Sequence, residues 1–175
     1  VAHMALVETR LDAELEQLLP TEAPSAFLVG VQPEQWEGVR SVLEEHRAEQ
    51  VRSVPVVTAR MAAIDGISIP DILAARHRDS ERRGGRGEWR LTREQRLTWL
   101  DELPADNTLL AGSLWSDDTL DELSIERDFA EEIGAVLGTR ITFDVQGVPV
   151  PLTVTSIRDV EWRSFGINFF LVVEP

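Results

Sequence analysis

The stretch that decides the fold is residues 123–175, which read LSIERDFAEEIGAVLGTRITFDVQGVPVPLTVTSIRDVEWRSFGINFFLVVEP. Its first part predicts a helix, because apolar residues recur at helical spacing from Ile125 to Leu137 and Ser124 is a good N-cap. Gly138 is expected to end that helix. The stretch holds no nucleophile–base pair, phosphate-binding loop or cluster of metal ligands, which favours a module that binds or transmits force over an enzyme.

The second part of the same stretch predicts a β-hairpin followed by one more strand. Apolar residues alternate along Ile141–Val145, as they do on a strand with one buried face. Gln146–Gly147 suits a two-residue hairpin turn, in which glycine supplies the positive φ. Val150–Trp162 then returns as the partner strand. Ile167–Val173 is the last predicted strand, with Phe169 expected in a packed sheet core.

Upstream of this stretch, the sequence predicts a strand, a helix and a second strand. Residues 26–31 form a short apolar run that is typical of a strand buried on both faces. Pro33 suits the first position of the helix that follows. Residues 51–64 return as a strand whose early part, at Pro55, is an edge or a bulge. This order predicts a βαβ or split-βαβ unit with a right-handed crossover.

The middle of the chain shows weaker patterns. Residues 68–75 predict a short helix, and residues 76–87 are rich in glycine and charge, which predicts a mobile loop. Residues 89–99 fit either a helix or a strand. Residues 109–115 indicate a strand, and residues 116–122 indicate an acidic loop.

Composition excludes several classes of function. The net charge of the chain is −14, whereas nucleic acids attract basic surfaces, so we expect no nucleic-acid partner. The chain has no cysteine, which excludes a disulfide framework and any cysteine-ligated metal. No apolar run approaches the roughly 20 residues that span a bilayer.

Candidate contact residues are confined to one basic segment. Arg78, Arg82, Arg83 and Arg86 are candidate contacts for a partner or for anionic lipid head groups, near which an arginine gains roughly 1 kcal/mol. A solvated flexible loop stays an alternative interpretation, because acidic residues interrupt this segment. Residues 116–122 lack the spacing of an EF-hand, so we expect no metal site there. We assign no catalytic or cofactor-binding residue and expect no cofactor.

Five blocks of the chain resemble one known family. They are APSAFLVGVQPEQ (residues 23–35), PVVTARMAAIDG (55–66), LTWLDELPADNTLLAGSLW (97–115), LSIERDFAEEIGAVLGTRITFDVQG (123–147) and VTSIRDVEWRSFGINFFLV (154–172). These blocks are similar to the first extracytoplasmic domain of FtsX-like ABC transporter permeases, and most similar to the large two-domain permeases of the YbbP type. The broader group includes MacB and LolC/LolE.

The resemblance implies an α+β fold of the kind found in MacB-like periplasmic core domains. An amphipathic stalk helix would span residues 5–20, after a tag remnant at residues 1–4. A porter-like βαβ sheet subdomain would comprise residues 21–112 and 165–175, and in the family it continues with a further βαβ unit. A small β-rich subdomain with one helix would comprise residues 113–164.

The resemblance also implies a function. The chain would be a non-catalytic extracytoplasmic domain of an ABC permease in a bacterial inner membrane. It would transmit ATP-driven movement, generated by a cytoplasmic ATPase on another chain, to a periplasmic lipid, lipoprotein, other hydrophobic substrate or partner protein. A periplasmic lysophospholipase/thioesterase is one such partner. Two alternatives stay open: a stand-alone lipid- or peptide-binding protein, and a hydrolase that uses carboxylates such as Asp106 or Asp118.

Overall fold

The computed structural model describes residues 24, 26–80, 88–116, 121–164 and 166–175. The predicted tag remnant and stalk helix therefore lie outside the described residues. The chain divides into two compact units, which we call the first unit (residues 1–53 and 163–165) and the second unit (54–162 and 166–175). Each unit is described by itself below.

The described part of the first unit contains one helix, α2 (Pro33–Glu45). The predicted start of this helix is confirmed, because Pro33 occupies its first turn and the backbone N–H of Gln32 donates to Oε1 of Gln35 over 3.0 Å. The strand predicted at residues 26–31 is wrong: these residues are irregular, and the side chain of Val29 is 79% exposed. An apolar run forms a strand only where a neighbouring strand bonds its backbone, and the described part of the chain offers none here.

The second unit is a mixed α/β structure built on one eight-stranded sheet. It contains more strand than helix, and the combination of helices with a sheet that was expected from the sequence is confirmed. The strands are β1 (Val57–Ile64), β2 (Ile67–Ser68), β3 (Glu94–Trp99), β4 (Asn107–Gly112), β5 (Glu122–Glu126), β6 (Arg140–Val145), β7 (Val148–Val160) and β8 (Leu171–Val173), and the helices are α3 (Ile69–Ser80), α4 (Glu88–Thr92) and α5 (Arg127–Ile133).

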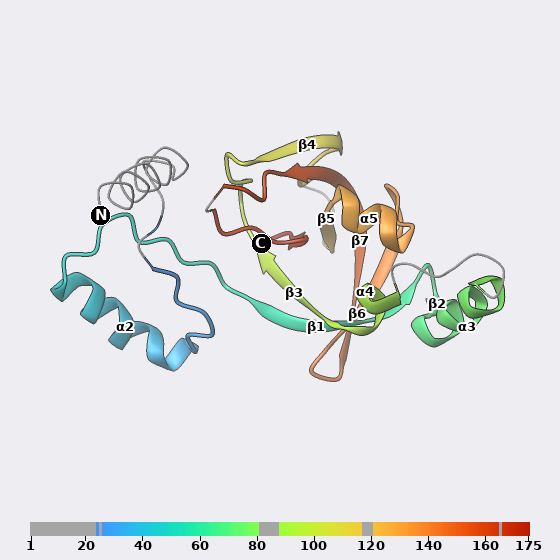
Figure 1. The fold of residues 1–175 in the computed structure, drawn as a ribbon, viewed down its shortest axis with the longest axis horizontal. Helices are drawn as coiled ribbons and strands as arrows, with labels where there is room; N and C mark the ends of the chain where they lie inside the picture. Colours follow the sequence, from blue (N-terminus) through green and yellow to red (C-terminus); the bar gives the residue numbers. More distant parts are fainter. Residues whose placement is uncertain (1–23, 25, 81–87, 117–120, 165) are drawn as a thin grey trace, which may run out of the picture. The chain divides into compact units, whose positions relative to one another are not determined.

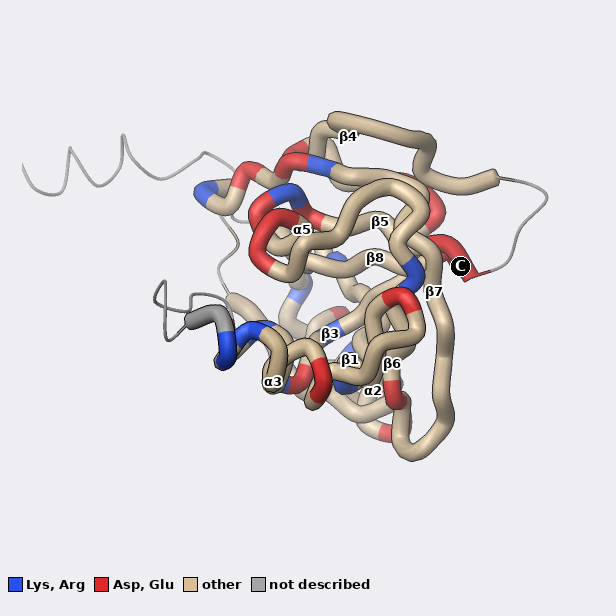
Figure 2. Tube along the Cα trace, turned by 90° about the vertical axis from the view of Figure 1, so that its right-hand side faces the viewer, with Lys and Arg blue, Asp and Glu red and all other residues tan. Residues whose placement is uncertain are grey.

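Six of these strands close into a ring by their pairing; Figure 1 labels all of them except β8, which Figure 2 labels between β5 and β3. The order around the ring is β1, β3, β8, β5, β7, β6 and back to β1, and each neighbouring pair is hydrogen-bonded. The pairs β3–β8 and β5–β7 are parallel, and the other four are antiparallel. Outside the ring, β4 extends the sheet along the free edge of β7, and β2 pairs with the end of β1. Ring closure leaves the six strands with few free backbone groups.

The hairpin predicted from the sequence is confirmed and supplies part of the core. Val145 pairs with Val148, and between them Gln146 and Gly147 have φ values of 53° and 88°. Both angles are positive, as a two-residue turn that matches the strand twist requires. On β6 the alternation is clear, because Phe143 is fully buried while its neighbour Asp144 is exposed.

The helix predicted from Ser124 to Gly138 is shorter than expected. Residues 122–126 form β5, which pairs with β7 on one side and β8 on the other. The first residues of the predicted helix, from Ser124 to Glu126, are therefore part of the sheet. Ser124 is therefore a buried strand residue rather than an N-cap. Glu126 caps α5 instead, accepting hydrogen bonds from the backbone N–H groups of Asp128 and Phe129. Gly134, with φ of 80°, ends the helix.

Two predicted loops are more regular than expected. The segment predicted as a loop from residue 76 is helical as far as Ser80, and residues 81–87 lie outside the described residues. In the predicted acidic loop, Glu122 is buried at the start of β5 and accepts hydrogen bonds from the backbone N–H and hydroxyl of Ser116. Residues 88–99 contain both alternatives left open by the sequence, α4 and then β3.

The last predicted strand is also shorter than expected. Only Leu171–Val173 forms β8, and Phe169 is half-buried rather than part of the core. Phe170 packs against the core in its place, with its ring centroid 5.4 Å from that of Phe129. The ring contains strands from both predicted subdomains. The porter-like subdomain was predicted at residues 21–112 and 165–175, and the small β-rich subdomain at residues 113–164. The boundary between those subdomains stays a prediction.

Candidate functional site

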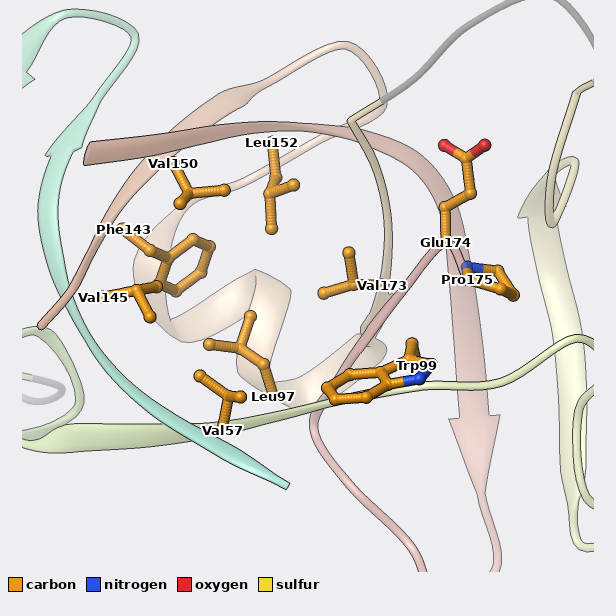
Figure 3. A pocket seen from close by; sticks show the side chains of 10 residues that line it. All are labelled: Val57, Leu97, Trp99, Phe143, Val145, Val150, Leu152, Val173, Glu174 and Pro175. Atoms are coloured by element: carbon orange, nitrogen blue, oxygen red, sulfur yellow. The ribbon is translucent and has the colours of Figure 1, made fainter. Parts of the chain in front are cut away.

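The interior of the ring is not completely filled. An open pocket of about 360 Å³ lies at one end of it, between β1, β3, β6, β7 and β8 (Figure 3). Its lining residues are almost all apolar and come from positions that face the inside of the ring. They are Val57, Leu97, Trp99, Phe143, Val145, Val150, Leu152, Val173, Glu174 and Pro175.

The pocket is lined partly by large buried side chains and partly by half-buried valines. Phe143, Leu152 and Leu97 are 0%, 3% and 5% exposed and form its inner wall. Trp99 is 44% exposed, and in Figure 3 its ring lies near the side chains of Leu97 and Val173. Four half-buried valines, Val57, Val145, Val150 and Val173, supply much of the remaining wall.

Glu174 is the one charged residue among those that line the pocket. It lies at the rim, directly after β8, and its backbone N–H donates to the carbonyl oxygen of Glu122 over 3.2 Å. The Oε2 atom of Glu174 is enclosed and has no hydrogen-bond partner among the described residues. An enclosed carboxylate oxygen without a donor is unfavourable, because its lost hydration is not replaced.

The lining residues can hold an apolar group but offer no acid–base pair. A general base needs a partner within hydrogen-bond reach, and here one carboxylate stands among aliphatic and aromatic side chains. Among the described residues, no group of three or more His, Asp or Glu side chains is arranged to hold a metal ion.

A second buried site, which sequence reasoning missed, surrounds Arg158 on β7. Its side chain is 0% exposed, and it donates to Oδ1 of Asn107 over 2.7 Å and to the carbonyl oxygen of Phe169 over 2.5 Å. Burial lowers the pKa of Arg158 to about 10, and the nearby carboxylate of Glu126 acts in the opposite direction. Arg158 falls on the alternating buried positions of β7, so the period of that strand could have revealed it.

Asp106, a candidate for carboxylate chemistry, belongs to this second site rather than to the pocket. Its carboxylate accepts hydrogen bonds from the side-chain amides of Asn168 (2.7 Å) and Asn107 (3.1 Å). Its backbone carbonyl accepts from the N–H of Glu161 (2.9 Å). These bonds join both ends of the segment between β7 and β8 to the turn before β4, which is a structural role. The other candidate, Asp118, lies outside the described residues.

Of the four arginines predicted as contacts, Arg78 alone lies among the described residues, and it does not line the pocket. Arg78 is exposed in the last turn of α3, and Figure 2 shows basic residues on that helix in blue. Arg82, Arg83 and Arg86 lie outside the described residues. The described chain resumes at residue 88 with α4. Directly after this helix, the guanidinium of Arg93 lies over the ring of Trp89, 4.4 Å from its centroid.

The sequence of this chain is homologous to that of an ABC transporter permease. No known protein-family model matches the chain. Over 157 residues, which are 90% of its length, it is 32% identical to the "Uncharacterized ABC transporter permease YbbP" of Escherichia coli (strain K12). This homology confirms the resemblance stated from the sequence. The chain spans only 18% of the length of that relative.

One solved structure is also similar in fold. It is the crystal structure of a domain of a putative permease protein from Porphyromonas gingivalis, with a TM-score of 0.41 and 13% sequence identity. The match covers 77% of this chain and 50% of that one. At this TM-score the likeness supports no further argument. Within the described residues, no helix is both long and apolar enough to span a bilayer.

Proposed function

We propose that this chain is a non-catalytic, extracytoplasmic domain of an ABC transporter permease. The observation that carries the proposal is the 32% identity with YbbP over 90% of the chain. On this proposal, ATP binds to a separate cytoplasmic subunit, and its hydrolysis moves this domain through the membrane part of the permease.

The domain would lie on the periplasmic side of a bacterial inner membrane and pass the movement on. The molecule on which it acts would be a lipid, a lipoprotein, another hydrophobic substrate or a partner protein such as a lysophospholipase/thioesterase. Arg78 would contact that partner or an anionic head group, together with Arg82, Arg83 and Arg86. The exposed position of Arg78 supports this part of the proposal.

The first test is the complete gene that encodes this chain. We expect bilayer-spanning segments to flank the domain, and we expect the tagged full-length product to co-purify with an ATPase subunit. A gene without any such segment would overturn the proposal. The purified 175-residue chain should hydrolyse neither ATP nor ester substrates, and turnover that follows the chain through successive purification steps would equally refute it.

The second test addresses movement in the intact complex. A photo-crosslinking residue at Arg78 should give products whose yield changes between the resting and ATP-hydrolysing states. Arg140, an exposed arginine at the start of β6, is the matched control and should give products that do not change. Identical yields at Arg78 in both states would contradict its role in a moving contact.

A further inference from the structure

We infer that β4 is the docking edge for a short, extended segment of another protein whose two ends carry basic residues. Such a segment would add to the sheet of the second unit as one more strand. The proposed function specifies neither this edge nor the chemistry of what binds there. The inference depends on β4 alone, so it can be tested on the 175-residue chain without an ATPase or a membrane.

β4 has one free edge. It pairs antiparallel with β7, and among the described residues no strand pairs with its other side. In both Figure 1 and Figure 2, β4 lies at the outside of the second unit. A strand with one unpaired side presents a row of backbone donors and acceptors, to which an extended chain can bind as an added strand.

The alternation of the ladder identifies the backbone groups that face away from β7. The N–H of Glu161 donates to the carbonyl oxygen of Asp106 over 2.9 Å, so these two residues form a directly bonded pair. Such pairs recur at every second residue of an antiparallel ladder, and Thr108 opposite Asp159 is the next one. Leu109 comes directly after that pair, so its N–H and C=O point to the free side of β4.

The side chains of β4 leave this edge open to an apolar segment. Leu109 and Leu110 are 42% and 48% exposed. Edge strands are often protected from pairing by lysine, proline or other charged residues, and Asn107–Gly112 contains none of these. The irregularity between Leu109 and Ala111 leaves Leu110 without a residue opposite it on β7. Because such a bulge twists its strand, a short segment fits this edge better than a long, flat one.

Charge selects the occupant. From residue 97 to residue 126 the chain has eight Asp or Glu residues and no Arg, Lys or His. Asp101 and Glu102 are exposed before β4, and Asp121 is exposed after it. A segment with basic residues at both ends is therefore attracted to this edge. A second copy of this chain would instead bring like charges together, since its net charge is also −14.

Two arginines near β4 are already engaged. Arg158 on β7 is buried and donates to Asn107 and to the carbonyl oxygen of Phe169. Arg127 is paired with Asp159 at 2.9 Å. These two arginines therefore do not neutralise the exposed acids before and after β4.

NMR titration of the isotopically labelled chain with three synthetic peptides tests the inference. The first, RRTVTVRR, alternates threonine and valine between basic ends; the second, EETVTVEE, has acidic ends; and the third is RRTVTVRR with N-methyl groups on its central residues. We expect one RRTVTVRR to bind per chain and to slow hydrogen exchange at the Leu109 amide. EETVTVEE should bind at least about tenfold more weakly, and the N-methylated peptide should not bind, because it offers no backbone donor there.

Leu109→Pro and Leu109→Ala form a matched pair of variants. Both remove the leucine side chain, but only proline also removes the N–H that faces the free side. Leu109→Pro should therefore weaken the binding of RRTVTVRR at least about tenfold relative to Leu109→Ala. Equal binding by the two variants would overturn the inference. The peptide comparison uses the unchanged chain, so the inference stays testable even if the proline variant does not fold.

Three results of the titration would refute the docking edge: no saturable binding of RRTVTVRR, equally tight binding of its N-methylated form, or slowed exchange only at residues outside β4. Sedimentation of the chain alone tests the other occupant. A dimer that Leu109→Pro abolishes would show that β4 pairs with a second copy, against the inferred basic partner. None of these results bears on the proposed role in a permease, which the gene and the crosslinking experiment test separately.

Discussion

Gly112, at the end of β4, is a position where substitution by alanine should strongly lower the free energy of unfolding. Its φ is +77°, and a Cβ atom there would lie 2.0 Å from the carbonyl oxygen of Thr155 on β7. The same atom would lie 3.0 Å from Cδ2 of Leu137. The Thr155 oxygen belongs to the backbone and cannot change rotamer as a side chain can. The contact can therefore be relieved only if β4 moves.

The size of the effect follows from these contacts. Holding alanine at a left-handed φ costs roughly 1 kcal/mol relative to glycine. Relieving the contact with Thr155 requires β4 to shift by about 1 Å, because real Cβ contacts are rarely shorter than 3.0 Å. That shift breaks the hydrogen bond from the N–H of Ser113 to the Thr155 carbonyl, now 3.2 Å long, and strains its neighbours, each worth about 1 kcal/mol. We therefore expect Gly112→Ala to lower the free energy of unfolding by about 3–4 kcal/mol.

Gly147→Ala is the matched control. Gly147 has a similar φ of +88° but nothing within 4 Å of the position of its Cβ atom, so only the backbone term of about 1 kcal/mol should apply. The difference between the two variants measures the close approach of β4 to β7 separately from the φ requirement.

Urea unfolding followed by tryptophan fluorescence provides the measurement. The assay should be run in a Trp36→Phe background, because the four tryptophans that remain of the five all lie in the second unit. If the two alanine variants differ by less than about 0.5 kcal/mol, β4 does not approach β7 as closely as described here, and the reasoning is refuted.

Three further predictions concern the core and the Arg158 site. Phe129→Ala should cost about 3–5 kcal/mol, because its ring is 0% exposed; a loss below about 2 kcal/mol in the same unfolding assay would contradict that burial. Asn107→Ala should cost about 2–3 kcal/mol, because it leaves the buried guanidinium of Arg158 without one acceptor, and a loss no larger than that of the exposed neighbour variant Thr108→Ala would argue against this bond. Glu126→Ala should cost about 1–2 kcal/mol through loss of the α5 cap and should speed amide hydrogen exchange in the first turn of that helix; unchanged exchange would rule out the cap.

Elements set by local chemistry could be predicted from the sequence. The start of α2 depends on Pro33 and its neighbours in the chain, and the β6–β7 turn depends on Gln146 and Gly147. Both were predicted correctly, because the conformation needs only residues that are adjacent in sequence.

Elements that depend on a distant partner could not be predicted in the same way. The predicted helix begins at Ser124, yet pairing with β7 and β8 makes residues 122–126 a strand. Residues 26–31 have the composition of a strand, yet the described part of the chain contains no strand paired with them. In both cases the deciding hydrogen bonds join residues far apart in the chain, and a local pattern carries no information about them.

The candidate sites show the same division. Arg158 could have been noticed from the alternation of β7, but its acceptors, Asn107 and the Phe169 carbonyl, come from elsewhere in the chain. The pocket had no counterpart in the sequence analysis. Its wall brings Val57, Leu97, Phe143 and Val173 together only because six strands close into a ring.

By itself, the sequence determined the homology to ABC transporter permeases, the mixed α/β class and the places where the chain turns, since each of these depends on residue identity and near neighbours. The tertiary structure alone decided which apolar residues lie in the core and which line a pocket. It also decided that Arg158 is buried away from solvent. The physical reason is that burial and strand pairing are properties of the closed ring. Its pairs join residues far apart in sequence, as where Leu97 on β3 pairs with Leu171 on β8.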